Sequence, residues 1–424
     1  MRIAFHTLGC KANQYDTQAM QEAAIEAGHT IVDFDGQADA YIINSCTVTA
    51  VGAKKSRQAV RQAKRRNPNA LVCMAGCYSK LEPEEAAKTG ADIVLGTRDR
   101  SGAIRLIESA VLGEEAYEIS ESSGFERLSI SRHGGHTRAF IKIQDGCDNF
   151  CSYCIIPYAR GRSCSRPIED IGAEAKELAR HHLEAVITGI HIASYGRDTA
   201  GSLKDAIGAI SDAGFKRVRL GSLEPGALTP EFLSALSNMP NICPQFHVSM
   251  QSGSAGVLER MNRKYTPKDY ANNIERLREF YPGAAITTDI IAGFPGETEK
   301  EHQETLEFVE KIGFSRIHVF PFSKRKGTPA YNMKECPKHV KLRRAAELID
   351  LGGRLEAEYA KKYEGMELNV LFEEEKDGEA EGYTENYIKV RVKGGIAGRI
   401  MDVYAVKFED GLMRGVLQTP GNNI

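Results

Sequence analysis

The chain has 424 residues, of which 42% are hydrophobic and 26% are charged, the composition of a globular protein with room for two or three domains. No stretch has the roughly 18 consecutive apolar residues of a membrane helix, and the N-terminus lacks the apolar core of a secretion signal, so a cytoplasmic protein is expected. The formal net charge of −2 identifies no partner, and a nucleic-acid surface would have to come from local clusters of basic residues.

The first part of the chain alternates between short apolar runs and helical stretches. The runs cover residues 2–9, 38–45, 70–76 and 91–97. Strands that alternate with helices predict a doubly wound parallel sheet, and hence an α/β domain over residues 1–113. The polar segment 114–136 has no strong period and is predicted to be a linker with at most one edge strand.

Six further apolar runs, separated by helical stretches, follow the linker. They cover residues 139–144, 184–190, 216–222, 244–250, 284–293 and 315–322. Six strand–helix units predict a partial TIM-like barrel, whose chemistry sits at the C-terminal ends of the strands. With a long charged helix expected at 337–365, the barrel domain covers residues 137–365.

The last part of the chain changes character. Three short alternating runs cover residues 366–375, 387–394 and 401–411. They predict a small antiparallel β-barrel of the OB type over residues 366–424, a shape that often binds nucleic acid.

Ten cysteines without an export signal indicate metal ligands, catalytic groups or buried thiols more than disulfides. Only Cys147, Cys151 and Cys154 form a tight group, in the stretch DGCDNFCSYCIIPYARG. Three thiolates can bind three irons of a cubane cluster and leave the fourth iron open. The alternative is a zinc site or buried thiols. Zinc would need a fourth ligand, and Cys164, ten residues further on, is the nearest candidate.

This CxxxCxxC pattern, with Tyr153 before its last cysteine and a barrel strand before its first, resembles the signature of the radical S-adenosylmethionine superfamily. The resemblance implies a 4Fe–4S cluster whose open iron binds the amino and carboxylate groups of S-adenosylmethionine. It also implies that the cofactor is cleaved to a 5′-deoxyadenosyl radical, and that Tyr153 lies against the adenine.

The longer stretch DGCDNFCSYCIIPYARGR resembles the methylthiotransferases of that superfamily, and the resemblance extends over nearly the whole chain. LGCKANQYD, INSCTVT and AGCYSK match cysteine segments of the family's N-terminal domain. The resemblance implies that Cys10, Cys46 and Cys77 bind a second 4Fe–4S cluster that carries the sulfur to be inserted. Cys73 lies inside an apolar run and is predicted to be buried. Cys164 departs from the family, which usually has arginine there; an exposed thiol at that position would be prone to oxidation.

The ends of the barrel strands supply candidates for holding the nucleoside and methionine parts of the cofactor. These are Gly189, His191, Glu224, Gln251 and Ser252, with Asp289 as a further candidate. For each of them a turn, a helix cap or a supporting polar group is the alternative interpretation.

Basic residues gather in three segments that could contact RNA. Residues 54–66 hold seven basic residues and no acidic one, and at ~100° per residue five of them share a helix face. These five are Lys54, Arg57, Arg61, Lys64 and Arg65. The other candidates are Arg160, Arg162 and Arg166 after the central cysteines, and Lys324, Arg325 and Lys326 after the last barrel strand. A charged face is usually only solvated, but this one lacks interspersed glutamates, which favours phosphate contact.

The C-terminal segment is similar to the TRAM module of RNA-modifying enzymes. It has seven basic and eleven acidic residues from Met366 to Ile424, so it does not attract RNA by net charge. The basic residues concentrate in YIKVRVKG, where one strand face could touch RNA, and a packing role is the alternative.

These resemblances together predict a tRNA methylthiotransferase. HTLGCKANQYD, IIPYARGRS and FPFSKRKGTPA are most similar to the subgroup that acts on threonylcarbamoyladenosine at position 37 of the anticodon loop. In that reaction a hydrogen leaves carbon two of the adenine, a sulfur couples there, and a second S-adenosylmethionine supplies the methyl group. Sibling subgroups act on isopentenyladenosine in tRNA or on an aspartate of a ribosomal protein. A non-catalytic iron–sulfur sensor that binds RNA, or a zinc-stabilised RNA-binding protein, is the alternative from another class.

The expected cofactors are two 4Fe–4S clusters and S-adenosylmethionine. The expected partners are tRNA, an electron donor of the reduced flavodoxin or ferredoxin type, and a sulfur donor. No membrane and no stable protein partner are implied.

Overall fold

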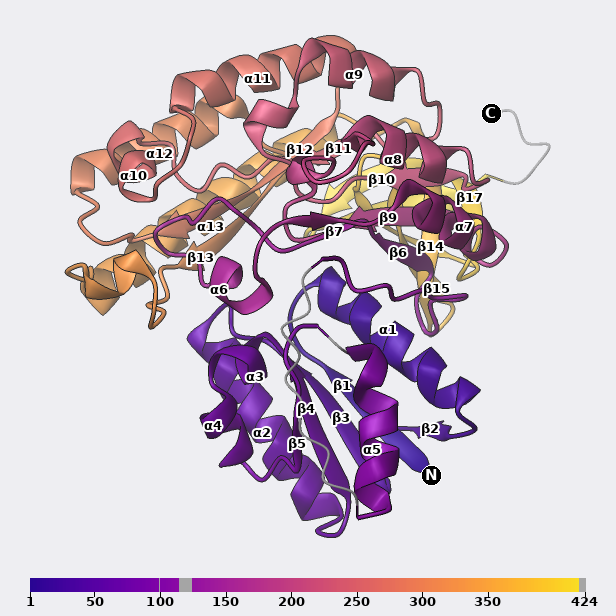
Figure 1. Ribbon diagram of the computed structural model, residues 1–424. Coiled ribbons are helices and arrows are strands. Elements are labelled where there is room, and N and C mark those ends of the chain that lie inside the picture. The colour runs from indigo at the N-terminus through magenta and orange to yellow at the C-terminus, as the bar shows by residue number, and fades with distance from the viewer. Residues whose placement is uncertain (99, 114–123, 419–424) are drawn as a thin grey trace.

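The computed structural model describes residues 1–98, 100–113 and 124–418. Figure 1 shows a sheet with helices on both faces below, a larger strand–helix unit above it, and a small β-barrel behind the upper unit. The predicted fold class, three α/β and β units in this order, is confirmed. Within the described residues, no helix has the length and apolar character that crossing a bilayer requires.

The lower unit is a five-stranded parallel sheet of order β2-β1-β3-β4-β5. Its strands are β1 (Arg2–Thr7), β2 (Thr30–Val32), β3 (Ala40–Ser45), β4 (Leu71–Gly76) and β5 (Ile93–Val94). Its helices are α1 (Lys11–Glu26), α2 (Ala50–Arg66), α3 (Cys77–Leu81), α4 (Pro83–Ala87) and α5 (Ala103–Val111). The four predicted strands are present, and the short β2 was missed because three residues are too few to show a period.

Helices cover both faces of this sheet, and they do so with the apolar residues of their sequences. In α2 the buried Ala53, Ala59, Val60 and Ala63 recur at helical spacing and pack against one face of the sheet. Residues of α1 and α5 pack against the other face together with Cys73, which is fully buried in the core. The prediction that Cys73 is a buried strand residue is therefore confirmed.

The upper unit is a partial barrel of six parallel strands in two sheets, β10-β9-β6 and β11-β12-β13. All six predicted strands are present, as β6 (Arg138–Lys142), β9 (Glu184–Thr188), β10 (Arg217–Arg219), β11 (Gln245–His247), β12 (Ala285–Ala292) and β13 (Arg316–Pro321). Bridges from Val218 to Ile242 and from Leu223 to Val248 join the two sheets. The outer helices are α7 (Ile168–Leu178), α8 (Leu203–Ser211), α9 (Pro230–Ser237), α10 (Ala255–Arg260), α11 (Pro267–Phe280) and α12 (Glu299–Ile312).

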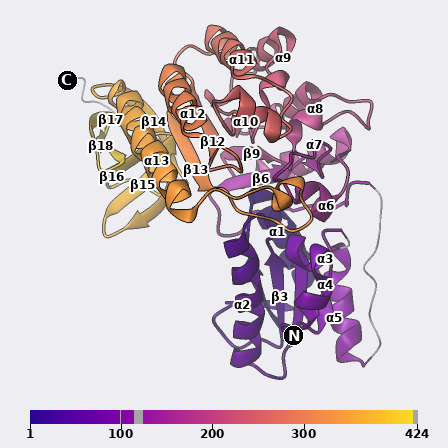
Figure 2. The ribbon, with the colours of Figure 1, turned by 90° about the vertical axis from the view of Figure 1, so that its left-hand side faces the viewer.

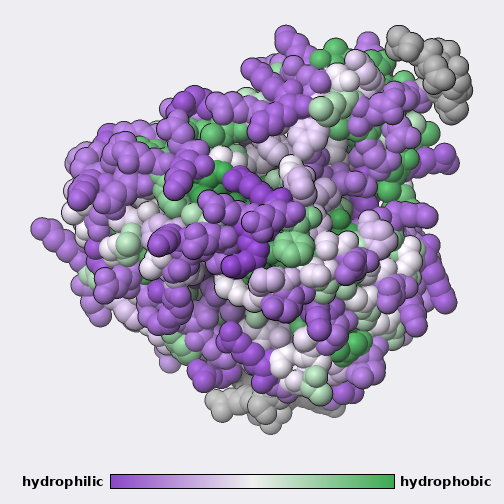
Figure 3. All heavy atoms as spheres, turned by 90° about the horizontal axis from the view of Figure 1, so that it is seen from above, coloured by the Kyte–Doolittle hydropathy of each residue, from purple (hydrophilic) through white to green (hydrophobic). Residues whose placement is uncertain are grey.

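The outer helices are amphipathic, with a polar outer face and an apolar inner face. Three of them begin with capping boxes, including Thr298 with Glu301 at the start of α12, which satisfies the free N–H groups of a first turn. The surface of the molecule seen from above is mostly hydrophilic, with small apolar patches (Figure 3). The apolar faces of the outer helices join the main core, which also includes Tyr15 and Ala19 of α1. Helix α1 therefore packs against the barrel as well as against its own sheet.

The C-terminal unit follows α13 (Lys338–Lys361) and is a closed antiparallel barrel of order β14-β15-β16-β18-β17, apart from one parallel pairing. Its strands are β14 (Glu367–Lys376), β15 (Glu379–Thr384), β16 (Lys389–Lys393), β17 (Ile400–Glu409) and β18 (Leu412–Leu417). The sequence predicted only three of these five. β15 and β18 escaped notice because each is short and holds a glycine in place of an apolar residue.

The small barrel is fixed to the large barrel through Arg217 and Arg219, the first and last residues of the short strand β10. The Arg217 guanidinium donates to the backbone carbonyls of Asn369 at 2.6 Å and Tyr383 at 3.1 Å. Arg219 donates to the carbonyl of Glu385 at 2.9 Å. Both arginines are buried, so the C-terminal unit closes the floor of the barrel, opposite the strand ends.

The structure describes only part of the predicted linker. Residues 114–123 lie outside the described residues, and residues 124–136 form neither helix nor strand, so the predicted edge strand is absent from that part. Leu128 and Ile130 are buried in the main core. This part of the segment is therefore packed on the barrel.

Candidate functional site

The central cysteines lie in a loop that neighbouring elements hold from two sides. The loop runs from β7 (Gln144–Asp145) to α6 (Ile156–Arg160), and β8 (Cys164–Ser165) then pairs back with β7. The Cys147 N–H donates to the Gly161 carbonyl at 3.1 Å. On the other side the Ser152 N–H donates to the Met261 carbonyl at 3.0 Å. These hydrogen bonds tie the loop to α6 on one side and to the end of α10 on the other.

Glycine at position 146 is a requirement of this loop. Gly146 has a φ of 71°, and a Cβ atom there would overlap the carbonyl of Arg162. Only glycine adopts this left-handed conformation without strain and also leaves room for the returning chain.

The three thiols lie near one another and are mostly enclosed. Burial raises the pKa of Cys147 to about 11 and that of Cys154 to about 12, and the neighbouring Cys151 thiol contributes in the same direction to both. Among the described residues, no three Cys, His, Asp or Glu side chains converge on a single metal ion. A cubane cluster binds each thiolate to a different iron, so three nearby but separate thiols fit a cluster better than one zinc ion.

A polar cluster adjoins this loop and is centred on Glu224. The Asn149 amide donates to its carboxylate at 2.8 Å, His191 Nε2 lies 3.2 Å away, and Arg263 lies 2.9 Å away. Burial raises the pKa of Glu224, but the contacts with His191 and Arg263 outweigh it and leave the pKa below its ordinary value. Glu224 is therefore ionised at neutral pH and remains about a quarter exposed, at 26%.

Two members of this cluster, Asn149 and Arg263, were not predicted from the sequence. Arg263 donates to the Cys151 sulfur at 3.2 Å and so joins the carboxylate to the cysteine loop. Asn149 lies between the first two cysteines, and that position within the motif was the available signal. Arg263 is isolated in the sequence, and only the fold brings it to the loop.

The other predicted cofactor residues fall into different surroundings. Tyr153 is half-buried, with its ring edge-on to Phe294 at 6.5 Å. Gln251 has a φ of 70° and its side chain is partly exposed. Ser252 is buried, and its hydroxyl lies 3.2 Å from that of Thr305, so its side chain supports the strand–helix turn and is closed to a ligand.

Two further candidates at the strand ends have visible structural partners. A Cβ atom at Gly189 would lie 2.8 Å from Ile192 and 3.0 Å from the Gln144 carbonyl, so close packing already explains this glycine. Asp289 is partly exposed, 3.4 Å from His247 Nε2.

Cys10, Cys46 and Cys77 lie at the carboxyl ends of β1, β3 and β4. These strands are neighbours in the sheet, so the three cysteines converge at one edge, as doubly wound sheets allow. A Cβ atom at Gly9 would lie 3.1 Å from the Cys46 sulfur, which places the Cys10 loop against Cys46. Burial raises the pKa of Cys77, and the Cys10 and Cys46 thiols add to the effect.

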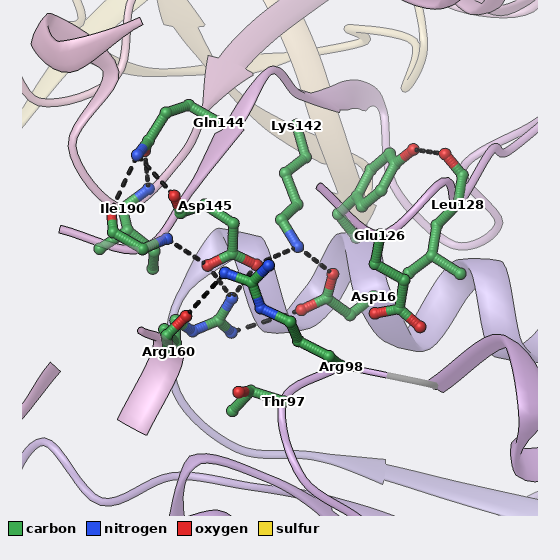
Figure 4. A network of polar contacts seen from close by, with 12 residues as sticks. Asp16, Thr97, Arg98, Glu126, Leu128, Lys142, Gln144, Asp145, Arg160 and Ile190 are labelled. Carbon is green, nitrogen blue, oxygen red and sulfur yellow. Dashed lines mark hydrogen bonds and ion pairs between the residues drawn. The ribbon is translucent and has the colours of Figure 1, made fainter. Parts of the chain in front are cut away.

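Figure 4 shows a buried network of charges that joins Asp16 of α1 to Lys142, Asp145 and Arg160 of the barrel unit. The Arg160 guanidinium donates to both oxygens of Asp145 at 2.8 and 2.9 Å and to the Asn13 side chain at 2.5 Å. Lys142 Nζ lies 2.8 Å from Asp16 and 2.6 Å from Asp145. Burial raises the pKa of Asp145, but Arg160, Lys142 and Arg100 outweigh it, and the pKa lies far below its ordinary value.

Two predicted RNA contacts are wrong because their side chains belong to the interior. Arg160 is fully buried in this network. Arg166 is also buried, with Glu174 at 2.5 Å and the Tyr15 hydroxyl at 3.1 Å. An RNA phosphate cannot reach either guanidinium without opening the core. Cys164 is also buried, so the idea of an exposed thiol there does not hold.

The remaining basic residues are at the surface or line a pocket. On α2, the side chains of Lys54, Arg61 and Arg65 are exposed, and Lys64 pairs with Asp92 at 2.7 Å. Arg162 is 77% exposed. The other candidates, Arg57, Lys324, Arg325 and Lys326, line a pocket of about 790 Å³ between the N-terminal unit and the barrel.

Comparisons with known proteins extend this description. The model of the radical SAM superfamily matches residues 141–309, and that of the uncharacterized protein family UPF0004 matches residues 2–96. The chain is 42% identical to the threonylcarbamoyladenosine tRNA methylthiotransferase MtaB of Bacillus subtilis, over 96% of this chain and 94% of that one. It is 33% identical to the tRNA-2-methylthio-N(6)-dimethylallyladenosine synthase of Pseudothermotoga lettingae, over 88% of each chain.

Among solved structures, the chain resembles the radical S-adenosylmethionine methyltransferase TsrM of Kitasatospora setae, solved with cobalamin and a [4Fe-4S] cluster bound. The TM-score is 0.59 at 15% sequence identity, over 78% of this chain and 77% of that one. At this identity the similarity shows a shared fold.

Proposed function

The chain belongs to the tRNA methylthiotransferase family of radical S-adenosylmethionine enzymes, and we propose that it converts threonylcarbamoyladenosine in tRNA to its 2-methylthio derivative. The observation that carries the proposal is the position of the 790 Å³ pocket. Its lining includes Thr47, Tyr78 and Ile155, which directly follow Cys46, Cys77 and Cys154. A base in this pocket would therefore lie beside both cysteine sets.

The residues of the central loop suit a cluster that binds S-adenosylmethionine. A 4Fe–4S cluster held by Cys147, Cys151 and Cys154 would supply, with that cofactor, the one-electron chemistry that removes a hydrogen from carbon. Arg263 positions the Cys151 sulfur. The ionised Glu224 can accept hydrogen bonds from an ammonium or from ribose hydroxyls, while Tyr153 offers a ring to an adenine.

We infer that Cys10, Cys46 and Cys77 hold a second cluster, which presents the sulfur. Three thiols at neighbouring strand ends support this inference, as does the cationic Arg160 beside them, which lowers the pKa of Cys77 against the larger effect of burial. Iron and sulfide analysis of anaerobically purified protein should give about eight irons per chain. The C10A/C46A/C77A variant should keep about four, and a C147A/C151A/C154A variant should keep the other four. Equal iron in the wild type and the first variant would contradict a second cluster.

The remaining partners are proposed on chemical grounds. The reaction needs an electron donor of the flavodoxin or ferredoxin type and a source of sulfur. We also propose that residues 1–113, 137–365 and 366–424 act as the cluster-bearing, radical and RNA-facing units.

Nucleoside mass spectrometry of tRNA from cells that lack the gene tests the substrate. The 2-methylthio derivative of threonylcarbamoyladenosine should disappear and return on complementation, while the dimethylallyladenosine derivative stays unchanged. A normal level of the first derivative would refute the assignment. Mixed anaerobically with reductant and S-adenosylmethionine, the protein should release 5′-deoxyadenosine, and a lasting failure to do so would favour a non-catalytic sensor.

A further inference from the structure

The 790 Å³ pocket is lined by two arginines, Arg57 and Arg325, and neither forms an ion pair within the described residues. Arg57 donates to the Tyr78 hydroxyl at 3.2 Å, and Arg325 is the more enclosed at its Nε. Arg325 is half-buried in the loop after β13, which lies at the boundary between the barrel and the N-terminal unit (Figure 2). Its Nη2 donates to the Thr47 hydroxyl at 2.6 Å. Its Nε is buried and has no hydrogen-bond partner among the described residues. Within the same residues its guanidinium forms no ion pair with a carboxylate: burial lowers the pKa of Arg325, and Glu82 raises it only through space, without a hydrogen bond.

Hydrogen bonds fix the backbone of the loop that carries Arg325, and the bond to Thr47 holds the guanidinium itself. The Thr328 hydroxyl donates to the Arg325 carbonyl at 2.8 Å, and the Ala330 N–H donates to the Ser152 carbonyl in the cysteine loop at 2.8 Å. The Ala50 N–H at the start of α2 donates to the Ser323 hydroxyl at 3.3 Å. A guanidinium has five N–H donors in a fixed fork. One that is held in place, half-buried and largely unpaired is suited to an anionic ligand.

The neighbouring lysines differ from Arg325 in a way that separates two kinds of contact. Lys324 and Lys326 line the same pocket but are exposed, and the Lys324 ammonium lies over the Tyr331 ring at 4.8 Å. Flexible exposed ammonium groups suit phosphates, which every tRNA carries. Glu82 and Glu85 also line the pocket, so its charge is not uniformly positive. The Arg57 guanidinium lies over the Tyr78 ring at 5.3 Å, whereas Arg325 keeps a buried N–H without a partner among the described residues.

Threonylcarbamoyladenosine differs from dimethylallyladenosine by chemistry that an arginine can detect. Its side chain ends in a carboxylate and a hydroxyl, whereas the dimethylallyl group is a neutral hydrocarbon. We propose that Arg325 binds the carboxylate of the threonylcarbamoyl group and thereby selects this nucleoside. This inference rests on the proposed function and adds to it the residue that sets specificity. A dimethylallyl group in the same place would leave the guanidinium desolvated and without a partner, which is unfavourable.

Binding of three tRNA anticodon stem-loops to the cluster-loaded enzyme tests the proposal. The stem-loops are identical except for the nucleoside next to the anticodon, which is threonylcarbamoyladenosine, dimethylallyladenosine or adenosine. Fluorescence anisotropy without S-adenosylmethionine reports affinity independently of turnover. The wild type should bind the first stem-loop about 10- to 100-fold more tightly than the other two, the range expected for hydrogen bonds to a charged group.

Three variants separate carboxylate recognition from phosphate contact. Arg325→Met should lose the preference and leave the affinity for the adenosine stem-loop nearly unchanged, and Arg325→Lys should restore part of the preference. Lys326→Met, the matched control, should weaken all three stem-loops equally and lower the salt dependence of binding. Iron content equal to that of the wild type confirms that each variant still holds its clusters.

Two results would overturn the inference. One is an Arg325→Met enzyme that keeps the wild-type preference, and the other is one that weakens all three stem-loops equally, as a phosphate contact would. The proposed function fails by a different observation, a wild type that neither prefers nor methylthiolates threonylcarbamoyladenosine RNA. The two failures are therefore distinguishable.

Discussion

Replacing Arg160 with methionine tests the buried charge network most directly. The side chain is fully buried, with Asp145 at 2.8 Å and Asp16 at 3.3 Å. Removing one partner of a buried ion pair typically costs about 3–5 kcal/mol, because the other charge stays in a medium of low dielectric. Here Lys142 still pairs with both carboxylates, at 2.8 and 2.6 Å. We therefore expect a loss near the lower end, about 3 kcal/mol.

Arg162 provides a matched control only two residues away. It is 77% exposed and pairs with Asp148 at 3.1 Å. Exposed pairs contribute about 0–1 kcal/mol, so Arg162→Met should leave stability almost unchanged. For tRNA affinity the order reverses, because only Arg162 is accessible to a phosphate.

Anaerobic urea unfolding followed by circular dichroism gives the stability of both variants, and anisotropy with labelled tRNA gives their affinity. The midpoint for Arg160→Met should fall clearly below that of the wild type, whereas the midpoint for Arg162→Met should match it. Equal midpoints for the two variants would show that the network contributes no more than a surface pair. The reasoning from burial would then be wrong.

Three further predictions concern the surface helix, the cysteine loop and the cofactor cluster. Reversing the charge of Arg61 on α2 should weaken tRNA binding for all sequences and reduce the slope of log affinity against log salt by about 1; an unchanged slope would mean that the helix only faces solvent. Gly146→Ala should destabilise the loop by at least ~1 kcal/mol through its positive φ and the overlap with a carbonyl, and should lower iron content, while Gly353→Ala, with open space around it, should do neither. Glu224→Gln should weaken S-adenosylmethionine in equilibrium dialysis without loss of iron, and unchanged affinity would remove Glu224 from the cofactor site.

The strands before the cysteines could be predicted because β3 and β4 are buried along nearly their whole length, and β1 is buried at Ile3 and Ala4. Such strands are continuous apolar runs that end in small or polar residues, and the cysteines follow these ends. The order β1-β3-β4 could not be derived in this way, since pairing depends on contacts between distant segments. Yet this order is what brings Cys10, Cys46 and Cys77 to one edge.

Arg160 and Arg162 show that the local sequence does not predict whether a basic side chain is buried or exposed. Arg160 and Arg162 are two residues apart in the stretch YARGR, and both resemble phosphate contacts. One is buried and the other exposed because Asp145 pairs back across the loop and Asp16 arrives from α1. Whether a basic side chain faces RNA or a carboxylate depends on partners that the local pattern does not contain.

The position of the charge network in the chain suggests why the interface between the two units is polar at its centre. Asp145 precedes Cys147 by two residues, Arg160 follows Cys154 by six, and Asn13 follows Cys10 by three. Each of these three residues is thus attached to a segment that also holds a cysteine. A shift of the N-terminal unit that changed the spacing between the cysteine sets would separate Arg160 from Asn13 and leave buried charges unpaired, which is costly. An apolar contact would tolerate such sliding, because it has no directional bonds. The network therefore opposes changes in the distance between the two sets, on which the proposed transfer of sulfur to a base held between them would depend.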